Sequence, residues 1–255
     1  TAHFQMAFGA TDGTTQRSGT CFSEDGTANS TDSKISYSGH AIILRNTSAN
    51  SKRATAAFIT NGVRFTLNAG AATAYRAQIA AFAGADLSAA SGSIALGTGT
   101  SAITTTLGFA ADLVIFFMND SQFDGTLNTA SALATYGACV NDGSATQRSV
   151  NFVEADGIAT QRPFMNLSTT QVMSIGSSAT GAKAWGVTCG NFTATAFDVT
   201  PDASTSSFQL GYLALGWTGR TAKIVSFDTA TAAGVQSVTG AGFTPSFAII
   251  VGTNL

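Results

Sequence analysis

The chain contains two copies of one stretch of sequence, and this repeat constrains the fold more than any other feature. The segment AFGATDGTTQRS at 7–18 matches TYGACVNDGSATQRS at 135–149 after a small insertion. The shared TQRS thus lies at 15–18 and again at 146–149, an offset of 131 residues. A repeat of this length predicts two structural units of the same kind.

Three further blocks recur in the same order with a slowly drifting offset. They are EDG at 24–26 with ADG at 155–157 (offset 131), YRAQIAAFAG from Tyr75 with FQLGYLALGW from Phe208 (offset 133), and Gly108-Phe109 with Gly242-Phe243 (offset 134). Matches that keep their order along the chain are not a product of composition. The sequence therefore predicts two copies of one unit.

The repeat is out of phase with the ends of the chain. One copy runs unbroken from 108 to 138, whereas the matching pieces of the other close the chain at 242–255 and open it at Thr1. We therefore expect a first unit at 1–107, completed by 242–255 or by its equivalent from a neighbouring unit. The second unit is expected at 108–241, with 242–255 as the opening strand of a further copy.

Three arrangements would explain this phase. The chain is one period of a longer tandem array, which is our first expectation, or it is circularly permuted and its last strand closes its own first unit. The third arrangement is donation of the last strand to the next copy of the chain. In each case the assembly strand containing Phe247, Ile249 and Val251 must be paired and buried in the unit at 1–107. It would take the place that 113–117 takes in the second unit.

The sequence pattern predicts strands rather than helices. Charged residues make up 10% of the chain and hydrophobic residues 44%, which is typical of a folded protein. Short segments rich in β-branched and aromatic residues alternate with Gly, Asn-Gly and Asp-Gly turns. We predict an all-β protein of two tandem antiparallel β-sandwich units, jelly-roll-like in form. The predicted inward-facing side chains are Phe65, Leu67, Ile79, Phe82, Val114, Phe116, Phe197, Leu213, Leu215, Ile249 and Val251.

Composition and charge argue against several functions. The net charge is −2 and the basic residues are scattered, so we expect no nucleic-acid binding. The longest apolar runs fall far short of the roughly 20 residues of a spanning helix, so we expect no membrane insertion. Three cysteines without CxxC spacing predict neither a disulfide framework nor a zinc site. We expect no cofactor.

No catalytic motif is present. The sequence lacks GxSxG and HExxH, and the repeat aligns the two histidines, His3 and His40, with a serine and a glutamine. We therefore expect that the chain is not an enzyme.

Acidic residues and arginines instead recur beside turns. Asp25 and Asp156 lie in Asp-Gly turns, where a carboxylate accepts local backbone hydrogen bonds. Arg17 and Arg148 are equivalent by the repeat, and we interpret all four residues as structural pegs that hold turns. The same oxygen-rich loops leave open whether calcium binds.

The order of these motifs resembles a group of repetitive structural proteins encoded in tailed-phage and prophage genomes, often beside tail genes. The matching segments are DGTTQRS, NGVRFTLN, FQLGYLALGW and AKIVSFDTATAAGVQSVTGAGFTPSFAIIV. The first copy departs from the pattern, with AFAGADL in place of YLALG and with GFAADL lacking the proline of GFTPSF.

The resemblance implies a non-enzymatic virion component built of β-sandwich units, most readily a tail or fibre protein. The implied partners are copies of itself or adjacent repeats, other virion proteins and a host surface glycan, and the implied location is the virion. The alternatives are a capsid decoration protein and a tandem-repeat adhesin of the bacterial cell surface.

Overall fold

The protein is all-β and its strands pair antiparallel, as the sequence predicted. The computed structural model describes residues 3–24, 32–45, 51–68, 77–129, 131–155, 164–177, 180, 182–203, 208–219, 221–228, 235–245 and 248–249. Within these ranges sixteen strands are present and no residue is helical, so no helix there could cross a membrane.

The strands form four antiparallel sheets. Sheet I has the order β1 (His3–Thr11), β2 (Gln16–Glu24), β3 (Ser33–Ser38). Sheet II has the order β4 (Ile42–Arg45), β5 (Ser51–Ile59), β6 (Gly62–Leu67). Sheet III has the order β12 (Phe164–Ser168), β11 (Gln147–Ala155), β10 (Ser131–Val140), β9 (Leu113–Met118), β16 (Gln209–Trp217), β7 (Leu87–Ala95). Sheet IV has the order β13 (Met173–Gly176), β14 (Lys183–Gly190), β15 (Ala196–Pro201), β8 (Ile103–Thr106).

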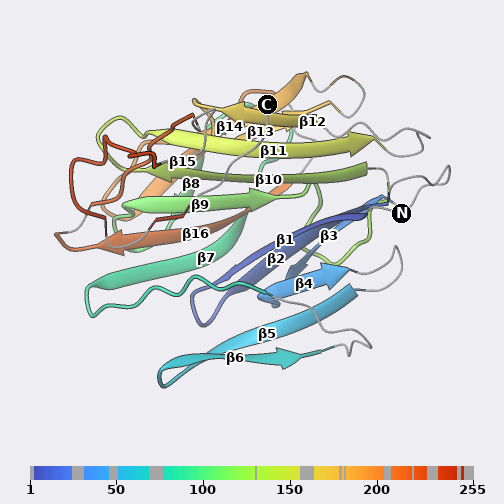
Figure 1. Cartoon of the computed structure of the whole chain (residues 1–255), viewed down its shortest axis with the longest axis horizontal. Coiled ribbons are helices and arrows are strands. Elements are labelled where there is room, and N and C mark those ends of the chain that lie inside the picture. The colour runs from blue at the N-terminus through green and yellow to red at the C-terminus, as the bar shows by residue number, and fades with distance from the viewer. Residues whose placement is uncertain are drawn as a thin grey trace.

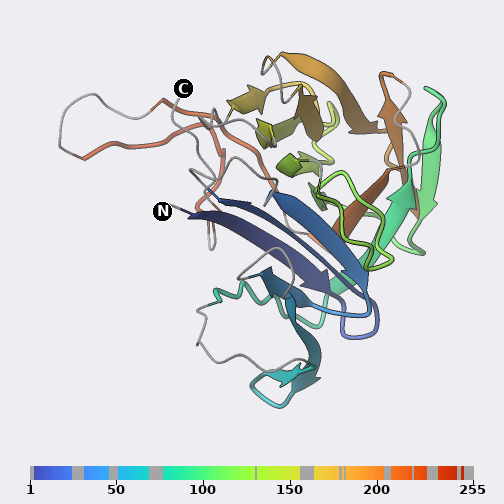
Figure 2. The ribbon, with the colours of Figure 1, turned by 90° about the vertical axis from the view of Figure 1, so that its right-hand side faces the viewer.

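The four sheets stack in the order IV, III, I, II (Figures 1 and 2). Sheet IV packs on one face of sheet III, mainly where β13 lies against β11. Sheet I packs on the opposite face, where β2 and β3 lie against β10. Sheet II follows beyond sheet I, with β4 against β1 and β2. Figure 2 shows the blue strands of sheet I in the middle of this stack.

The apolar run LVIFFM forms the central strand β9, whose two faces are both buried. Successive side chains of a strand point to opposite faces. Val114 and Phe116 belong to the core between sheets III and IV, where the Phe116 ring lies 5.9 Å from that of Phe197. Phe117 points the other way, and its ring lies 5.2 Å from the Phe8 ring of sheet I. A strand covered on both sides has to be apolar throughout, which explains the uninterrupted run.

The strand pairing joins residues 87–106 to the second half of the chain. β7 pairs with β16 along its whole length, from Leu87 opposite Trp217 onward, and β8 pairs with β15. Sheets III and IV are therefore built from one continuous stretch, 87–217. The sequence-based boundary after residue 107 had grouped β7 and β8 with the first unit, whereas their hydrogen-bond partners lie in the second.

The predicted inward-facing residues divide between the two halves. Val114, Phe116, Phe197 and Leu215 are buried, as predicted, and Phe82 and Leu213 are half-buried. The prediction was wrong for residues that the structure leaves exposed: Phe65, Leu67, Ile79 and Ile249.

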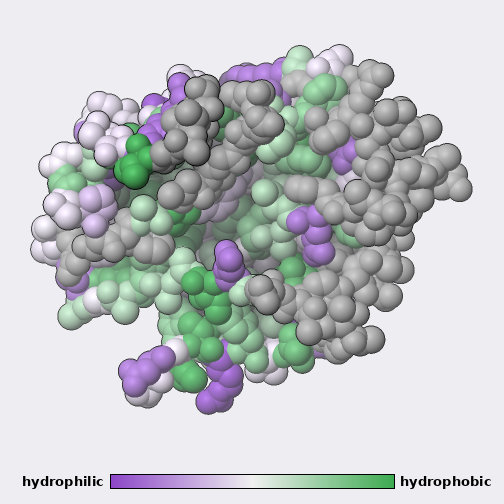
Figure 3. All heavy atoms as spheres, viewed as in Figure 1, coloured by the Kyte–Doolittle hydropathy of each residue, from purple (hydrophilic) through white to green (hydrophobic). Residues whose placement is uncertain are grey.

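Phe65 and Leu67 are exposed because they lie on β6, which is the last strand of sheet II. Within the described residues no strand pairs with the outer edge of β6, and Leu67 is 71% exposed. Phe58 and Ile59 at the end of β5 are exposed as well. Figure 3 shows apolar surface in the lower part of the molecule, where Figure 1 places β5 and β6. Val251 lies outside the described residues.

At two glycine positions a carbonyl oxygen of the neighbouring sheet comes so close to the backbone that any side chain would clash with it. A methyl group added at Gly137 in β10 would overlap the carbonyl oxygen of Val172, and one at Gly9 in β1 would overlap that of Ala41.

We predict that Gly137→Ala destabilises the protein by about 3 kcal/mol, because the backbone of two packed layers must shift. Urea denaturation measures this. The control Gly190→Ala, at a strand position with open space, should change stability by less than about 1 kcal/mol; equal effects would contradict the prediction.

Candidate functional site

The packing of sheet I against sheet III is the candidate functional site, because it joins the two halves of the chain. Its apolar part contains Cys21, Met6 and Phe8 from sheet I and Ala132, Ala134 and Phe152 from sheet III. The Phe117 ring lies between those of Phe8 and Phe123, with centroids 5.2 Å and 6.1 Å away. Tilted and edge-on ring pairs of this kind stabilise a contact beyond the area that they bury.

A buried ion pair crosses the same contact. Lys34 of β3 is only 2% exposed, and its Nζ donates to Asp120 Oδ2 and to Ser131 Oγ, each at 3.0 Å. Burial raises the pKa of Asp120, and the Lys34 ammonium counteracts part of that rise. Because a buried charge needs a partner, this pair fixes where β3 lies on sheet III.

Asn119 fixes the contact further through its side-chain amide, which makes four hydrogen bonds. Its Nδ2 donates to the carbonyls of Thr20 and Ile35 at 3.0 and 2.9 Å. Its Oδ1 accepts from the hydroxyls of Ser36 and Ser121 at 2.7 and 2.6 Å. A buried amide with this many partners tolerates only one arrangement of the strands around it.

The segment that follows Asn119 lies along the free edge of β3. Ser38 N–H donates to the Phe123 carbonyl at 3.0 Å, and Gly125 N–H donates to the Ser36 carbonyl at 2.9 Å. Lys34 and Asn128 exchange two backbone hydrogen bonds, at 2.8 and 3.0 Å. Residues 123–128 of the second half therefore act as an edge strand for sheet I.

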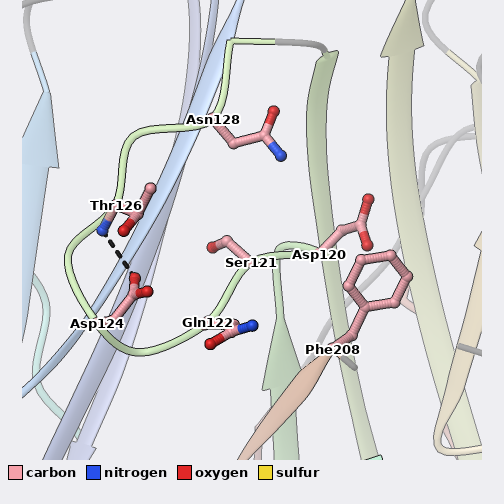
Figure 4. Close-up of a pocket in the computed structure, with 7 residues that line it drawn as sticks. All are labelled: Asp120, Ser121, Gln122, Asp124, Thr126, Asn128 and Phe208. Carbon is pink, nitrogen blue, oxygen red and sulfur yellow. Dashed lines mark hydrogen bonds between the residues drawn. The ribbon is translucent and has the colours of Figure 1, made fainter. Parts of the chain in front are cut away.

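A surface hollow of about 220 Å³ opens beside this segment (Figure 4). It is lined by Asp120, Ser121, Gln122, Asp124, Thr126, Asn128 and Phe208. Asp124 accepts from Thr126 N–H at 2.8 Å, and Figure 4 shows Asp120 and Asp124 on opposite sides of the loop. The two carboxylates therefore do not form an acid–base pair. Among the described residues no group of three or more His, Cys, Asp or Glu side chains could hold a metal ion.

Arg17 and Arg148 lie at the second positions of β2 and β11, directly after the hairpin turns. Arg17 Nη1 donates to the Gln16 carbonyl at 2.9 Å, and its Nε donates to Ser93 Oγ of β7 at 3.2 Å. Each arginine thus binds its own strand and a second segment of chain.

Arg148 makes the matching set of bonds. Its Nη1 donates to the carbonyls of Gln147 and Thr169, at 2.7 and 2.5 Å, and its Nε donates to Ser226 Oγ at 2.8 Å.

The other predicted site residues are not brought together in the described structure. Asp25, Asp156, Phe247 and Val251 lie outside the described residues. Ile249 is exposed and lies in no strand. The role of the assembly strand therefore stays a prediction.

Sequence reasoning missed the glutamines next to the arginines. Gln16 Oε1 accepts from Ala56 N–H at 2.8 Å, and its Nε2 donates to the Ala56 carbonyl at 3.1 Å. Gln147 does the same with Cys189, at 2.9 and 3.1 Å. Gln16 thereby joins sheet I to sheet II, and Gln147 joins sheet III to sheet IV. The signal was present, since TQR recurs at both turns.

The sequence suggested Asp12 and Asp142 only as possible calcium ligands, and the structure shows both as carboxylates that accept hydrogen bonds from turn N–H groups. Asp12 Oδ1 accepts from the N–H groups of Thr14 and Thr15 at 2.8 and 2.7 Å. Its Oδ2 accepts from Ser91 N–H of β7 at 2.9 Å.

Asp142 closes the second turn in the same way. Its Oδ1 accepts from the N–H groups of Ser144 and Thr146, at 3.1 and 3.2 Å. Its Oδ2 accepts from the Thr146 hydroxyl at 2.6 Å and lies 3.4 Å from Lys223 Nζ. These hydrogen bonds, that of the Thr146 hydroxyl above all, lower the pKa of Asp142 to about 2.

The three cysteines are free and buried. Burial raises the pKa of Cys21 to about 12, and burial likewise raises the pKa of Cys189. Thiols held protonated in this way are poor nucleophiles and poor metal ligands. Their contribution is to packing, since Cys139 and Cys189 belong to the core between sheets III and IV.

The polar groups at the contact bind backbone groups, hydroxyls and one another, so the arrangement holds sheets in register.

No known protein family, no curated protein and no solved structure matches the chain.

Asp142 generates a prediction about pH. Its pKa in the folded state is about 2, below the ordinary value of 3.8, so the ionised carboxylate stabilises the fold above about pH 4. This contribution is lost as the pH falls from 4 toward 2. We predict that Asp142→Asn costs about 1 kcal/mol at pH 7, after allowance for solvent screening, and only a small part of that at pH 2. Urea denaturation across this range tests it. A constant cost for Asp142→Asn across this range would contradict the prediction.

The Lys34 ion pair generates a second prediction. Lys34→Met leaves the carboxylate of Asp120 largely buried without its cation, and we expect a loss of about 3 kcal/mol. The double variant Lys34→Met/Asp120→Asn should lose clearly less. As a matched control, Lys183→Met removes an exposed ion pair with Asp202 and should cost less than about 1 kcal/mol. Equal costs for Lys34→Met and the double variant in urea denaturation would show that the pair is not coupled.

Proposed function

We propose that the chain consists of two copies of one β-sandwich unit, and that sheets I and II belong to the first copy. The hairpins support this at the offsets read from the sequence. Ala10 lies opposite Arg17 in the β1–β2 pair, and Ala138 lies opposite Arg148 in the β10–β11 pair. Equivalent residues therefore hold equivalent positions in the two ladders.

The strand register of sheet II matches that of sheet IV in the same way. Ile42 lies opposite Ala54 between β4 and β5, and Met173 lies opposite Val187 between β13 and β14. The next pair of strands agrees as well, since Thr55–Thr66 corresponds to Thr188–Thr200.

The observation that carries the proposal is that the same side-chain hydrogen bonds and glycine contacts recur at the two hairpin turns. A glutamine amide closes on the opposite sheet in both halves, a turn carboxylate binds the same N–H groups, and a glycine lets a carbonyl approach. Chance would not place three kinds of contact at matching positions. Many proteins with a structural role are built by repeating one rigid unit.

We propose that the protein is a non-enzymatic structural component of a bacteriophage virion, built from these units as a tail or fibre part. A charge-poor stack of sheets held together by side-chain hydrogen bonds at its turns suits a load-bearing role. Its partners would be copies of itself and other virion proteins, and no cofactor is required. A capsid decoration protein, with the same architecture at a different place in the particle, is the nearest alternative.

The hollow of Figure 4 favours a second candidate function, glycan contact at a host or cell surface. It presents hydroxyl, amide and carboxylate groups beside the Phe208 ring, which stacks on Trp185 with centroids 5.5 Å apart. Polar groups beside an aromatic ring are typical of sugar recognition. An adhesin of the bacterial surface would use the hollow in this way.

Mass spectrometry of purified virions with immunogold labelling tests the location. We expect the protein in the particle, with gold at the tail. Label on the head would support capsid decoration, and label on bacterial cells without any in virions would overturn the virion proposal. Incubation with host polysaccharide serves as the test of enzyme activity, since release of sugars would contradict the non-enzymatic role.

A further inference from the structure

Cys139 and Cys189 lie in the two sheets that face each other across the main core. Cys139 is in β10 of sheet III, and Cys189 is in β14 of sheet IV. Both side chains belong to the apolar core between these sheets, with 0% and 4% of their surface exposed. Each thiol therefore points toward the sheet that carries the other.

Gln147 holds the backbones of the two cysteines next to each other. It lies directly opposite Cys139 in the β10–β11 ladder, so the two side chains leave sheet III on the same face. The Gln147 amide accepts from Cys189 N–H at 2.9 Å and donates to the Cys189 carbonyl at 3.1 Å. One residue thus connects the strand position of Cys139 to that of Cys189.

The two thiols are direct neighbours. Cys139 Sγ lies 3.9 Å from the carbonyl oxygen of Cys189. Burial raises the pKa of Cys189, and the neighbouring Cys139 thiol raises it further. Rotation about the Cα–Cβ bonds changes the distance between the sulfur atoms without moving either strand, so facing cysteines this close can be bridged.

Cys21, the third cysteine, lies on the opposite face of sheet III. It belongs to the cluster between sheets I and III, where it packs with Phe152. Sheet III therefore separates it from the core that holds Cys139 and Cys189. Only one pairing of the three thiols is open within the folded chain.

The first half of the chain has the same geometry without the thiols. Gln16 lies opposite Thr11 in the β1–β2 ladder, and its amide binds the backbone N–H and carbonyl of Ala56. Thr11 and Ala56 therefore hold the positions that the two cysteines hold in the second half. A covalent link of this kind is confined to sheets III and IV.

We propose that Cys139 and Cys189 form a disulfide between sheets III and IV when the chain folds under oxidising conditions. Two S–H bonds break and one S–S bond forms. The two protons and two electrons pass to a small-molecule disulfide, such as oxidised glutathione, which is reduced to two thiols. The bond joins positions 50 residues apart in the sequence, and closing a loop of that length restricts the unfolded chain.

Burial determines when this bond forms. Enclosed thiols that stay protonated react slowly, so a chain that has folded in a reducing environment keeps both of them. Oxidant reaches the thiols while sheets III and IV come together, and the closed core then shields the disulfide from reductants. The inference concerns the second half of the chain alone and does not depend on the proposed virion role.

Oxidative refolding of the full chain tests the proposal. The reduced protein is refolded from guanidinium with reduced and oxidised glutathione, and is then unfolded again with iodoacetamide to label its free thiols. Intact mass spectrometry should show one label, at Cys21, whereas protein refolded with reductant alone should carry a label on each of the three cysteines. After trypsin digestion, a cross-linked peptide should connect Cys139 to Cys189.

The cysteine variants provide the controls. Cys21→Ala removes an equally buried thiol and should form the same disulfide, with no label left. Cys139→Ala and Cys189→Ala should each carry labels on both remaining cysteines. Labels on all three cysteines of the unmodified chain after oxidative refolding to the native circular dichroism spectrum would overturn the proposal. A cross-link through Cys21, or glutathione bound in place of the cross-link, would overturn it as well.

Urea denaturation gives an independent readout, followed by the fluorescence of Trp185 in the same core. The oxidised protein should have an unfolding equilibrium constant lower than that of the reduced protein by about a hundredfold or more. Cys139→Ala should unfold identically in both states. An oxidised form that unfolds as easily as the reduced form would mean that the bond does not fit the native fold. Neither result depends on whether virions contain the protein.

Discussion

Burial of sheet III on both faces is the constraint on which the rest of the structure depends. One face forms the core with sheet IV, and the other carries sheet I. β9 must then be apolar at every position, with Phe116 on one side and Phe117 on the other. Close packing on two sides also requires glycine where a ring or a carbonyl approaches the backbone, as at Gly211 beside Phe117. The position of every other layer follows from this one sheet.

Side-chain hydrogen bonds, many of them from uncharged amides and hydroxyls, hold the layers together. Only 10% of the residues are charged, and the contacts that lock the hairpins come from Gln16, Gln147 and two turn carboxylates. Neutral hydrogen bonds depend little on ionic strength, whereas surface ion pairs weaken in salt. Fastening of this kind should therefore depend little on salt concentration.

The sequence predicted well those features that are local or periodic. Strand character and the buried positions Val114 and Phe116 follow from short patterns, because neighbouring residues decide them. The partners of β7 and β8 did not follow. A repeat identifies which strands are equivalent, but equivalent strands can pair within either copy, and only the three-dimensional pairing of Leu87 with Trp217 decides between them. The glutamines were missed because an amide has no titration or charge pattern that marks it in a sequence.

The exposed apolar side chains of β6 follow from the same ambiguity. Phe65 and Leu67 have the alternation of a half-buried strand, and the prediction that they face inward assumed that the neighbouring strand was in place. An unprotected edge with such side chains invites pairing with other chains.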